Sequence, residues 1–189
     1  MLVEIESQLE KLLQCVNDTL LHADAFPKEK ILSLATEILD TFTNGNKVAF
    51  VGNGGSAAEA MHIAAEFTGK CVLDHRPLDV ICLNESQSAL TAIANDYGVE
   101  YIFSRQVEAH LKENDLLIGL TTSGKSANIL QALKSAQEIG VKTMLWTGSS
   151  APEIPGVRIW RAPSNSTPRA QEIHLIWGHL LAELVESQL

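Results

Sequence analysis

The stretch at residues 51–70, VGNGGSAAEAMHIAAEFTGK, contains the pattern that decides the fold. It follows an apolar run at residues 47–51 that suits a buried strand, passes through a glycine-rich turn, and continues with apolar residues at helical spacing. The first N–H groups of a helix have no partner within the helix, and the aligned peptide dipoles favour negative charge there. The stretch therefore predicts an anion-binding loop at Asn53, Gly54, Gly55 and Ser56.

Two polar residues of the same predicted helix share one face. His62 and Glu66 lie four residues apart, which places their side chains one above the other. A histidine and a carboxylate in this arrangement suit a divalent metal, with zinc accepting both ligand types, and they also suit proton transfer. The alternative is that the pair is merely solvated, as most isolated His/Glu pairs on helix surfaces are.

The last predicted helix offers partners for this pair. Gln171 and His179 are two turns apart, so they lie on roughly one face, in an apolar neighbourhood where a polar group needs a partner. His174 is expected on the polar side of that helix and is not assigned a role. His75 and His110 have no supporting pattern.

The rest of the chain alternates between strand and helix patterns. Strands are expected at residues 47–51, 78–83, 115–121, 141–147 and 157–161, and helices at 86–95, 102–111, 127–139 and from Pro168 almost to Leu189. Two amphipathic helices, at about 2–23 and 31–42, precede the first strand. The alternation predicts one α/β domain over residues 1–189, with a helical pair at 1–44 and a core at 45–189 built on a five-stranded parallel sheet.

Composition limits the classes of function. The chain of 189 residues is 46% hydrophobic and 20% charged, with a net charge of −9, which argues against a general nucleic-acid or membrane-surface binder. Its cysteines, Cys15, Cys71 and Cys82, are odd in number and lack metal spacing, so we expect reduced thiols in a cytoplasmic protein. The acidic N-terminus does not resemble a signal peptide, and no apolar run is long enough to span a bilayer.

A second loop of small polar residues follows the third predicted strand. It contains Thr121, Thr122, Ser123 and Ser126, whose hydroxyl groups could bind the same anion as the first loop. Neither loop has the P-loop pattern, so a nucleoside triphosphate site is not expected. Each loop alone could simply cap a helix. Two such loops at the ends of neighbouring strands favour a phosphate site.

Four segments together resemble one family. GNGGSAAEAMHIAAEFTGK, AIANDYGVEYIFSRQVEA, TTSGKSANILQALKSAQEIG and TPRAQEIHLIWGHLLAELVE are similar to the sugar isomerase (SIS) domains, and more narrowly to the sedoheptulose 7-phosphate (phosphoheptose) isomerases. The resemblance runs from about residue 40 to the C-terminus, and the N-terminal helices fit it as well. It implies a flavodoxin-like three-layer α/β sandwich and a homotetramer with active sites between subunits.

The resemblance also implies an aldose–ketose isomerase, active on sedoheptulose 7-phosphate through an enediol(ate), at the first step towards heptose for lipopolysaccharide or other glycans. It implies one zinc ion per subunit, held at His62, Glu66, Gln171 and His179. Glu66 would be the base and His179 the partner acid/base. Phosphate and sugar contacts would come from the two loops, from Gln171 and from residues Asn95 and Asp96.

Three positions depart from the family pattern. Thr121 replaces a frequent serine and keeps the hydroxyl group, whereas Lys70 replaces an arginine and loses its planar fork. Pro168 stands where some members have a substrate-binding aspartate, which leaves the exact sugar and anomer open. The alternatives are a non-enzymatic DnaA-binding regulator of the same fold, a sugar-phosphate-sensing module, and an isomerase of another phosphosugar. Members of the DnaA-binding branch lack the acid/base and zinc pattern that this sequence contains.

Overall fold

The structure, a computed structural model, describes residues 2–189, with side chains from residue 5 onward. The strands are β1 (Val48–Gly52), β2 (Val80–Cys82), β3 (Leu116–Leu120), β4 (Lys142–Thr147) and β5 (Arg158–Arg161). The helices are α1 (Leu2–Leu20), α2 (Lys28–Thr43), α3 (Gly55–Thr68), α4 (Gln87–Tyr97), α5 (Ser104–His110), α6 (Ala127–Glu138) and α7 (Thr167–Glu186), with a short 3-10 turn, η1 (Val99–Tyr101). Each predicted strand and helix is present, with its ends shifted by a few residues.

The five strands form one parallel sheet in the order β2-β1-β3-β4-β5. The chain runs outward in one direction from β1 to β2 and in the other from β3 to β5, so the strand order reverses between β1 and β3. In an open α/β sheet, ligands bind at this reversal, beyond the carboxyl ends of the strands. The prediction of a five-stranded parallel sheet is confirmed, and both loops predicted to bind an anion flank the reversal.

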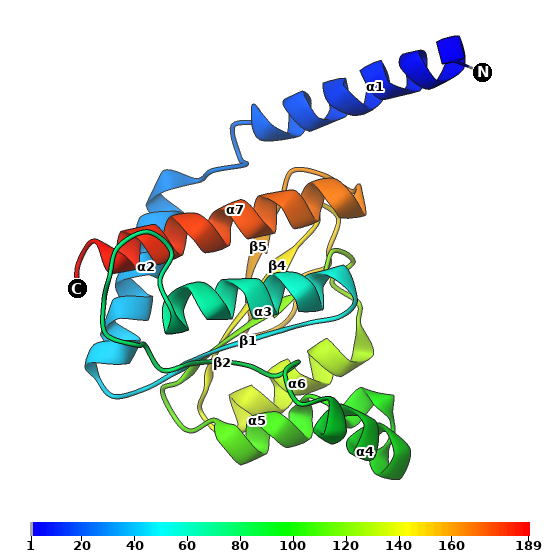
Figure 1. Cartoon of the computed structure of the whole chain (residues 1–189). Helices are drawn as coiled ribbons and strands as arrows, with labels where there is room; N and C mark the ends of the chain where they lie inside the picture. The colour runs from blue at the N-terminus through cyan, green and yellow to red at the C-terminus, as the bar shows by residue number, and fades with distance from the viewer. Residues whose placement is uncertain (1) are drawn as a thin grey trace.

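Helices cover both faces of the sheet and create a three-layer sandwich (Figure 1). Strand residues alternate between the two faces: Phe50 and Ile118 pack with α2, α3 and α7, whereas Ala49 and Leu117 pack with α5 and α6. All strand positions of β1 and β3 are buried, as expected for a parallel sheet covered on both sides. The apolar core thus fixes the height and direction of α3 and α7, which hold most of the predicted site residues.

The two N-terminal helices do not form a pair. Helix α2 is part of the sandwich and buries Ile31, Leu34 and Ile38 in the same core as α7. Helix α1 projects away from the body, and four of its large apolar side chains are half exposed: Ile5, Leu9, Leu12 and Leu13. Among residues 2–189, none of the helices combines the length and the apolar character needed to cross a bilayer.

Helices α3 and α7 run side by side in the same direction (Figure 1). Contacts mark three levels along them: Gln171 touches Ser56, His179 touches His62, and Glu186 touches the segment just after α3. The helices approach so closely that a Cβ atom on Gly178 would lie 2.4 Å from Ile63 Cγ1. Gly178 therefore permits the contact that brings the early and the late polar residues together.

His174 is buried in the core, contrary to the expectation that it lies on a polar face. Its side chain is 0% exposed beside Trp146 and Trp177, and its Nε2 atom lies 3.1 Å from the carbonyl oxygen of Thr147. Burial lowers the pKa of His174 from 6.5 to about 4, and the hydrogen bond with Thr147 opposes this shift only in part. The expectation is wrong because α7 is covered on more than one side, by α3, α2 and the sheet, so its buried surface is wider than one apolar stripe.

This buried imidazole predicts acid sensitivity of the fold. The unfolded chain binds a proton at His174 below pH 6.5, whereas the folded chain does so only below about pH 4. The free energy of unfolding therefore contains the full contribution of neutral His174 above pH 6.5. As the pH is lowered from 6.5 to 4, this contribution falls by about 1.4 kcal/mol per pH unit, about 3 kcal/mol in total. Urea unfolding of wild type and His174→Phe at several pH values would measure the difference. Parallel pH slopes for the two proteins would refute this role, and His110→Gln, at an exposed histidine, is the matched control.

Candidate functional site

Three helices begin at the carboxyl edge of the sheet without a side-chain cap. Helices α3, α6 and α7 have Gly54, Ser126 and Ser166 at the N-cap, and none of these residues caps its helix with a side-chain hydrogen bond. In α4, by contrast, the Ser86 hydroxyl accepts a hydrogen bond from the Ala89 N–H group. Within the described residues, the N-cap side chains of α3, α6 and α7 accept no hydrogen bond from the first turn, and in α6 only the Ile129 N–H group is bonded to a side chain, that of Asn128. Helix starts of this kind bind phosphate groups.

Hydroxyl groups converge at the same edge. The Thr121 Oγ1 atom lies 2.9 Å from Ser126 Oγ and 3.4 Å from Ser123 Oγ. The Ser123 hydroxyl also accepts a hydrogen bond from the Lys125 N–H group, which fixes the loop. On the other side of the strand reversal, the buried Ser56 lies in the first turn of α3. The two loops predicted from sequence therefore meet at one edge and present both hydroxyl and N–H donors.

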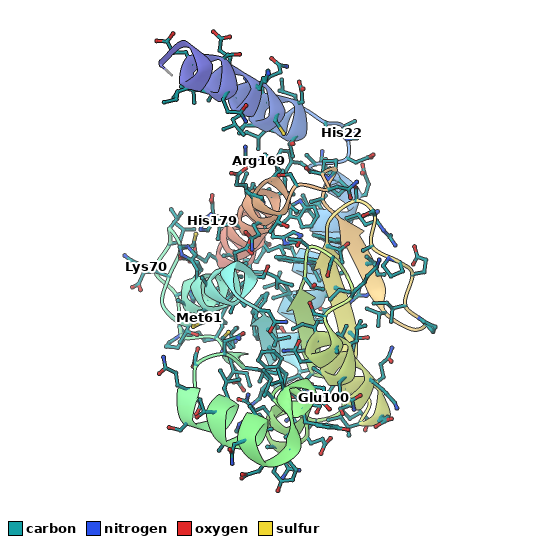
Figure 2. The ribbon with its side chains drawn as sticks, turned by 90° about the vertical axis from the view of Figure 1, so that its right-hand side faces the viewer. His22, Met61, Lys70, Glu100, Arg169 and His179 are labelled. Carbon is teal, nitrogen blue, oxygen red and sulfur yellow. The ribbon has the colours of Figure 1, made fainter. Side chains whose placement is uncertain are left out.

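His62, Glu66 and His179 form a compact cluster between α3 and α7. Atom His62 Nε2 lies 3.0 Å from Glu66 Oε1 and 3.0 Å from His179 Nε2. Candidate ligand atoms of all three residues lie within 4.8 Å of one another. The Glu66 side chain is 20% exposed and the His62 side chain 48% exposed, so the cluster opens to the surface on this side of the molecule. Figure 2 labels His179 and Met61, which mark this side of α7 and α3.

The cluster fits a tetrahedral zinc ion. Two imidazole nitrogen atoms at about 2.0–2.1 Å from zinc would lie about 3.3 Å apart, close to the observed 3.0 Å. Two neutral imidazoles whose Nε2 atoms face each other can share only one proton, and the nearby carboxylate adds negative charge. A cation between the three groups would satisfy all of them. The chemistry of the donor set therefore suits a metal ion.

The remaining predicted site residues lie at two further places. Gln171 is two turns before His179 on α7, and its Nε2 atom lies 3.3 Å from Ser56 Oγ, so its amide links the cluster side of α7 to the first anion loop. Asn95 and Asp96 are on α4, where the Asn95 side-chain amide donates a hydrogen bond of 2.7 Å to Asp96 Oδ1. Helix α4 belongs to the layer on the opposite face of the sheet (Figure 1). Within one chain, Asn95 and Asp96 are not brought to the cluster.

Glu59 is a buried carboxyl group on the same face of α3, between Ser56 and Glu66. Neither of its oxygen atoms has a hydrogen-bond partner in the described part of the chain. Burial raises its pKa from 4.5 to about 7, outweighing the nearby Ser56 hydroxyl, which lowers it. Near neutral pH, Glu59 is thus only partly ionised and adds less negative charge next to the anion loop than an ordinary carboxylate would.

The segment after α3 is held by the far end of α7. The Glu186 carboxylate accepts hydrogen bonds from the backbone N–H groups of Cys71, Val72 and Leu73, and it pairs with His75 Nε2 at 3.2 Å. Burial alone would raise the pKa of Glu186, but the backbone N–H groups and His75 more than offset it, so the pKa is lowered. His75, which had no pattern in the sequence, therefore has a structural role. The segment begins at Lys70, near the end of α3 that carries Glu66 (Figure 2).

Cys71 does not add a thiolate to the cluster of the metal-free protein. Burial, together with the nearby carboxylates of Glu66, Glu186 and Glu183, raises the pKa of its thiol from 9.0 to about 11. The thiol is protonated at neutral pH. The thiols of Cys15, Cys71 and Cys82 are all free.

Sequence reasoning missed two polar residues of this edge. Thr167 Oγ1 lies 3.4 Å from Thr122 Oγ1, which places the start of α7 beside the second anion loop. Asn128 exchanges two side-chain hydrogen bonds with Asn53. A hydroxyl residue directly before Pro168 at a helix start was a usable signal for Thr167. The Asn53–Asn128 contact joins residues 75 positions apart and had no local signal.

Comparison with known proteins gives one consistent result. Residues 13–148 match the family model described as SIS domain. A phosphoheptose isomerase from Aliarcobacter butzleri is 45% identical over 166 residues, 86% of each chain. A phosphoheptose isomerase from Citrifermentans bemidjiense is 43% identical over all of this chain and 97% of its own length.

Solved structures agree with the sequence relatives. The phosphoheptose isomerase GmhA from Neisseria gonorrhoeae superimposes with a TM-score of 0.88 at 32% identity, covering 97% of this chain and 99% of its own. A phosphoheptose isomerase from Francisella tularensis gives a TM-score of 0.85 at 30% identity, covering 98% of each chain.

Proposed function

Because this chain belongs to the phosphoheptose isomerases of the SIS domain family, we propose that it interconverts sedoheptulose 7-phosphate and D-glycero-D-manno-heptose 7-phosphate. The observation that carries the proposal is the short distance between Glu66, His62 and His179, next to an edge where three uncapped helices begin. An anion site and an acid/base cluster within one site are what a phosphosugar isomerase requires.

The phosphate group binds first in this account. The N–H groups at the starts of α3 and α6, with the hydroxyl groups of Ser56, Thr121, Thr122, Ser123 and Ser126, supply the donors. The sugar chain then extends along α3 and α7 towards Glu66 and His179, with the amide groups of Asn53 and Gln171 on its path. Binding energy from the phosphate thereby places the carbonyl end of the substrate at the catalytic groups.

The reaction moves one proton between neighbouring carbon atoms and one between neighbouring oxygen atoms. The Glu66 carboxylate removes a proton from C1 of the ketose, which gives an enediol(ate), and returns a proton to C2 to form the aldose. His179 delivers a proton to the C2 oxygen and accepts one from the C1 oxygen, as an imidazole can near neutral pH. His62, 3.0 Å from both groups, orients them.

We also propose that His62, Glu66, Gln171 and His179 hold one zinc ion in each subunit. When bound, zinc supplies a Lewis acid that polarises the carbonyl oxygen and fixes α3 against α7. The distances among His62, Glu66 and His179 support this assignment. Gln171 lies two turns before His179 on α7 and its amide contacts Ser56, so as the fourth ligand its side chain would turn from Ser56 towards the cluster.

The half-exposed apolar residues of α1 support a homotetramer. Leu9 and Leu13 lie on a helix that contacts the body mainly through α7, and a helix with such a face is stable when a neighbour covers it. Subunit contact would also bring Asn95 and Asp96 of one chain to the cluster of another, which places active sites between subunits. Light scattering should give four times the chain mass of 20.5 kDa; a monomer mass would contradict this assembly.

A direct assay tests the proposed function. Purified protein with sedoheptulose 7-phosphate should form the aldose, and a chelator should abolish its formation until zinc is restored. Zinc content should be one ion per chain, and it should fall in His62→Ala and His179→Ala. If the zinc-loaded protein forms no aldose, the proposed isomerase activity is wrong. If protein without zinc turns over at the full rate, the proposed zinc requirement is wrong. Fructose 6-phosphate in parallel tests for another phosphosugar, a possibility kept open by Pro168.

Other SIS-fold functions are not favoured. A DnaA-binding regulator is expected to lack the acid/base and zinc residues, and this chain has His62, Glu66, Gln171 and His179 in place. Sugar-phosphate metabolism and three free thiols also agree with a cytoplasmic enzyme. Binding of DnaA without turnover in the same assay would reverse this preference.

A further inference from the structure

Two asparagine side chains hold the loop between β1 and α3 from opposite sides. Asn84, after β2, accepts a hydrogen bond from Gly52 N at 3.1 Å and donates one to Gly52 O at 2.9 Å. Asn128, in the first turn of α6, donates to Asn53 Oδ1 at 2.9 Å and accepts from Asn53 Nδ2 at 2.8 Å. Neighbouring residues, Gly52 and Asn53, are therefore each held by a reciprocal pair of hydrogen bonds.

The Asn53–Asn128 contact crosses the strand reversal where the anion loops meet, and the Gly52–Asn84 contact holds the same loop from the neighbouring strand β2. Asn84 follows β2, Gly52 ends β1 and Asn53 follows it, and Asn128 follows the loop after β3. Asn128 is only 8% exposed, and its Oδ1 atom also accepts a hydrogen bond from Ile129 N. A buried amide is costly unless its groups are paired, and here the pairing partner is the side chain of Asn53.

The loop that they hold needs external support. Gly54 adopts a φ of +55°, Gly55 follows it, and the N-cap of α3 has no side-chain hydrogen bond. Glycines lose more conformational freedom on ordering than other residues. A loop fixed before the ligand arrives avoids that entropy loss at the binding step and keeps its N–H groups aimed at the anion.

We propose that Asn128 and Asn84 are positioning residues that hold Asn53 and the start of α3 in the anion-binding geometry. The inference rests on the proposed function for the identity of the substrate, a phosphorylated sugar. What it claims is that these two side chains raise the affinity of the loop for the phosphate group. Asn128 acts through Asn53, and Asn84 acts through the backbone of Gly52. Neither residue belongs to the cluster of His62, Glu66 and His179.

The first test measures binding of inorganic phosphate to the purified full chain by calorimetry, together with KM and kcat for sedoheptulose 7-phosphate. Asn128→Ala should weaken phosphate binding and raise KM by about 10-fold, the effect of losing one buried hydrogen-bonding partner, while kcat changes by less than about 3-fold. Asn53→Ala and the double variant Asn53→Ala/Asn128→Ala should have the same phosphate affinity within about 2-fold, because the two residues act as one unit.

The matched control is Asn46→Ala, at the opposite end of β1. Asn46 also makes tertiary hydrogen bonds, to Asp115 Oδ1 at 3.0 Å and to the carbonyl of Glu113 at 3.1 Å. Its replacement should lower stability without changing phosphate affinity. Asn84→Ala, on a different loop, is the second variant if Asn128→Ala does not fold, and it should also weaken phosphate binding several-fold.

Phosphate affinity and KM equal to wild type in the folded variants would overturn the proposal, and so would additive losses in the double variant. An equal loss in Asn46→Ala would overturn it too, because the effect would then be general destabilisation. If the wild type binds phosphate but does not isomerise sedoheptulose 7-phosphate, the proposed function fails while the phosphate measurements still decide the role of Asn128.

Discussion

Replacement of Glu66 by glutamine is expected to lower kcat by ~10²–10⁴-fold, the usual contribution of one acid/base group. The substitution keeps the size and the hydrogen-bonding shape of the side chain but removes the group that accepts the carbon-bound proton. It also removes a charged member of the cluster, whose oxygen lies 3.0 Å from His62 Nε2. Steady-state kinetics with sedoheptulose 7-phosphate measures the effect.

Phosphate affinity separates loss of chemistry from loss of structure. Glu66→Gln should bind inorganic phosphate as wild type does, because the anion loops are three turns away at the start of α3. Glu138→Gln, at an exposed carboxylate paired with Lys134 at the end of α6, should retain full activity. Wild-type turnover in Glu66→Gln would remove this carboxylate from the mechanism.

Replacement of Gly178 by alanine is expected to damage both stability and activity. The new Cβ atom would lie 2.4 Å from Ile63 Cγ1 and 2.6 Å from Ile63 Cδ1, so either the Ile63 side chain leaves its packed position or α3 and α7 move apart. Overpacking of this kind costs about 1–3 kcal/mol. His179 follows Gly178 directly, and a displacement of about 1 Å between catalytic groups can cost ~10²-fold in rate. Urea unfolding and steady-state kinetics measure the two effects.

A compensating variant tests whether the contact itself is responsible. Ile63→Ala removes the atoms that clash, so the double variant Ile63→Ala/Gly178→Ala should be more active than Gly178→Ala alone. Gln188→Ala, at an exposed residue just after α7, is the control and should keep wild-type stability and activity. Equal activities of Gly178→Ala and wild type would show that the spacing of α3 and α7 does not limit catalysis.

Periodicity predicted the sheet and the cluster for identifiable reasons. Strands buried on both faces appear as short apolar runs, such as residues 116–120, between helical patterns. Only a few sheet topologies are compatible with such an alternation of strands and helices. His62 and Glu66 were found because a spacing of four defines one helix face. His179 was found because a histidine in an apolar helix needs a partner. The resemblance to SIS domains then joined the two helices.

Features set by tertiary contacts were not accessible from local pattern. Two amphipathic helices precede β1, but nothing in their periodicity shows that α2 joins the core while α1 stands apart. His174 was placed on the wrong side because the apolar surface around α7 is wider than one stripe. The Asn53–Asn128 and Gly52–Asn84 hydrogen bonds join distant segments whose pairing depends on the strand order.

The most direct measurement follows wild-type protein with sedoheptulose 7-phosphate in D₂O by proton NMR. The proton held by the Glu66 carboxyl group exchanges with solvent, so the aldose heptose 7-phosphate should carry deuterium at C2. Glu66→Gln should form this product at least ~10²-fold more slowly than wild type. Absence of the aldose with zinc-loaded protein, or equal rates for the two proteins, would contradict the account of Glu66 and His179 as one catalytic pair.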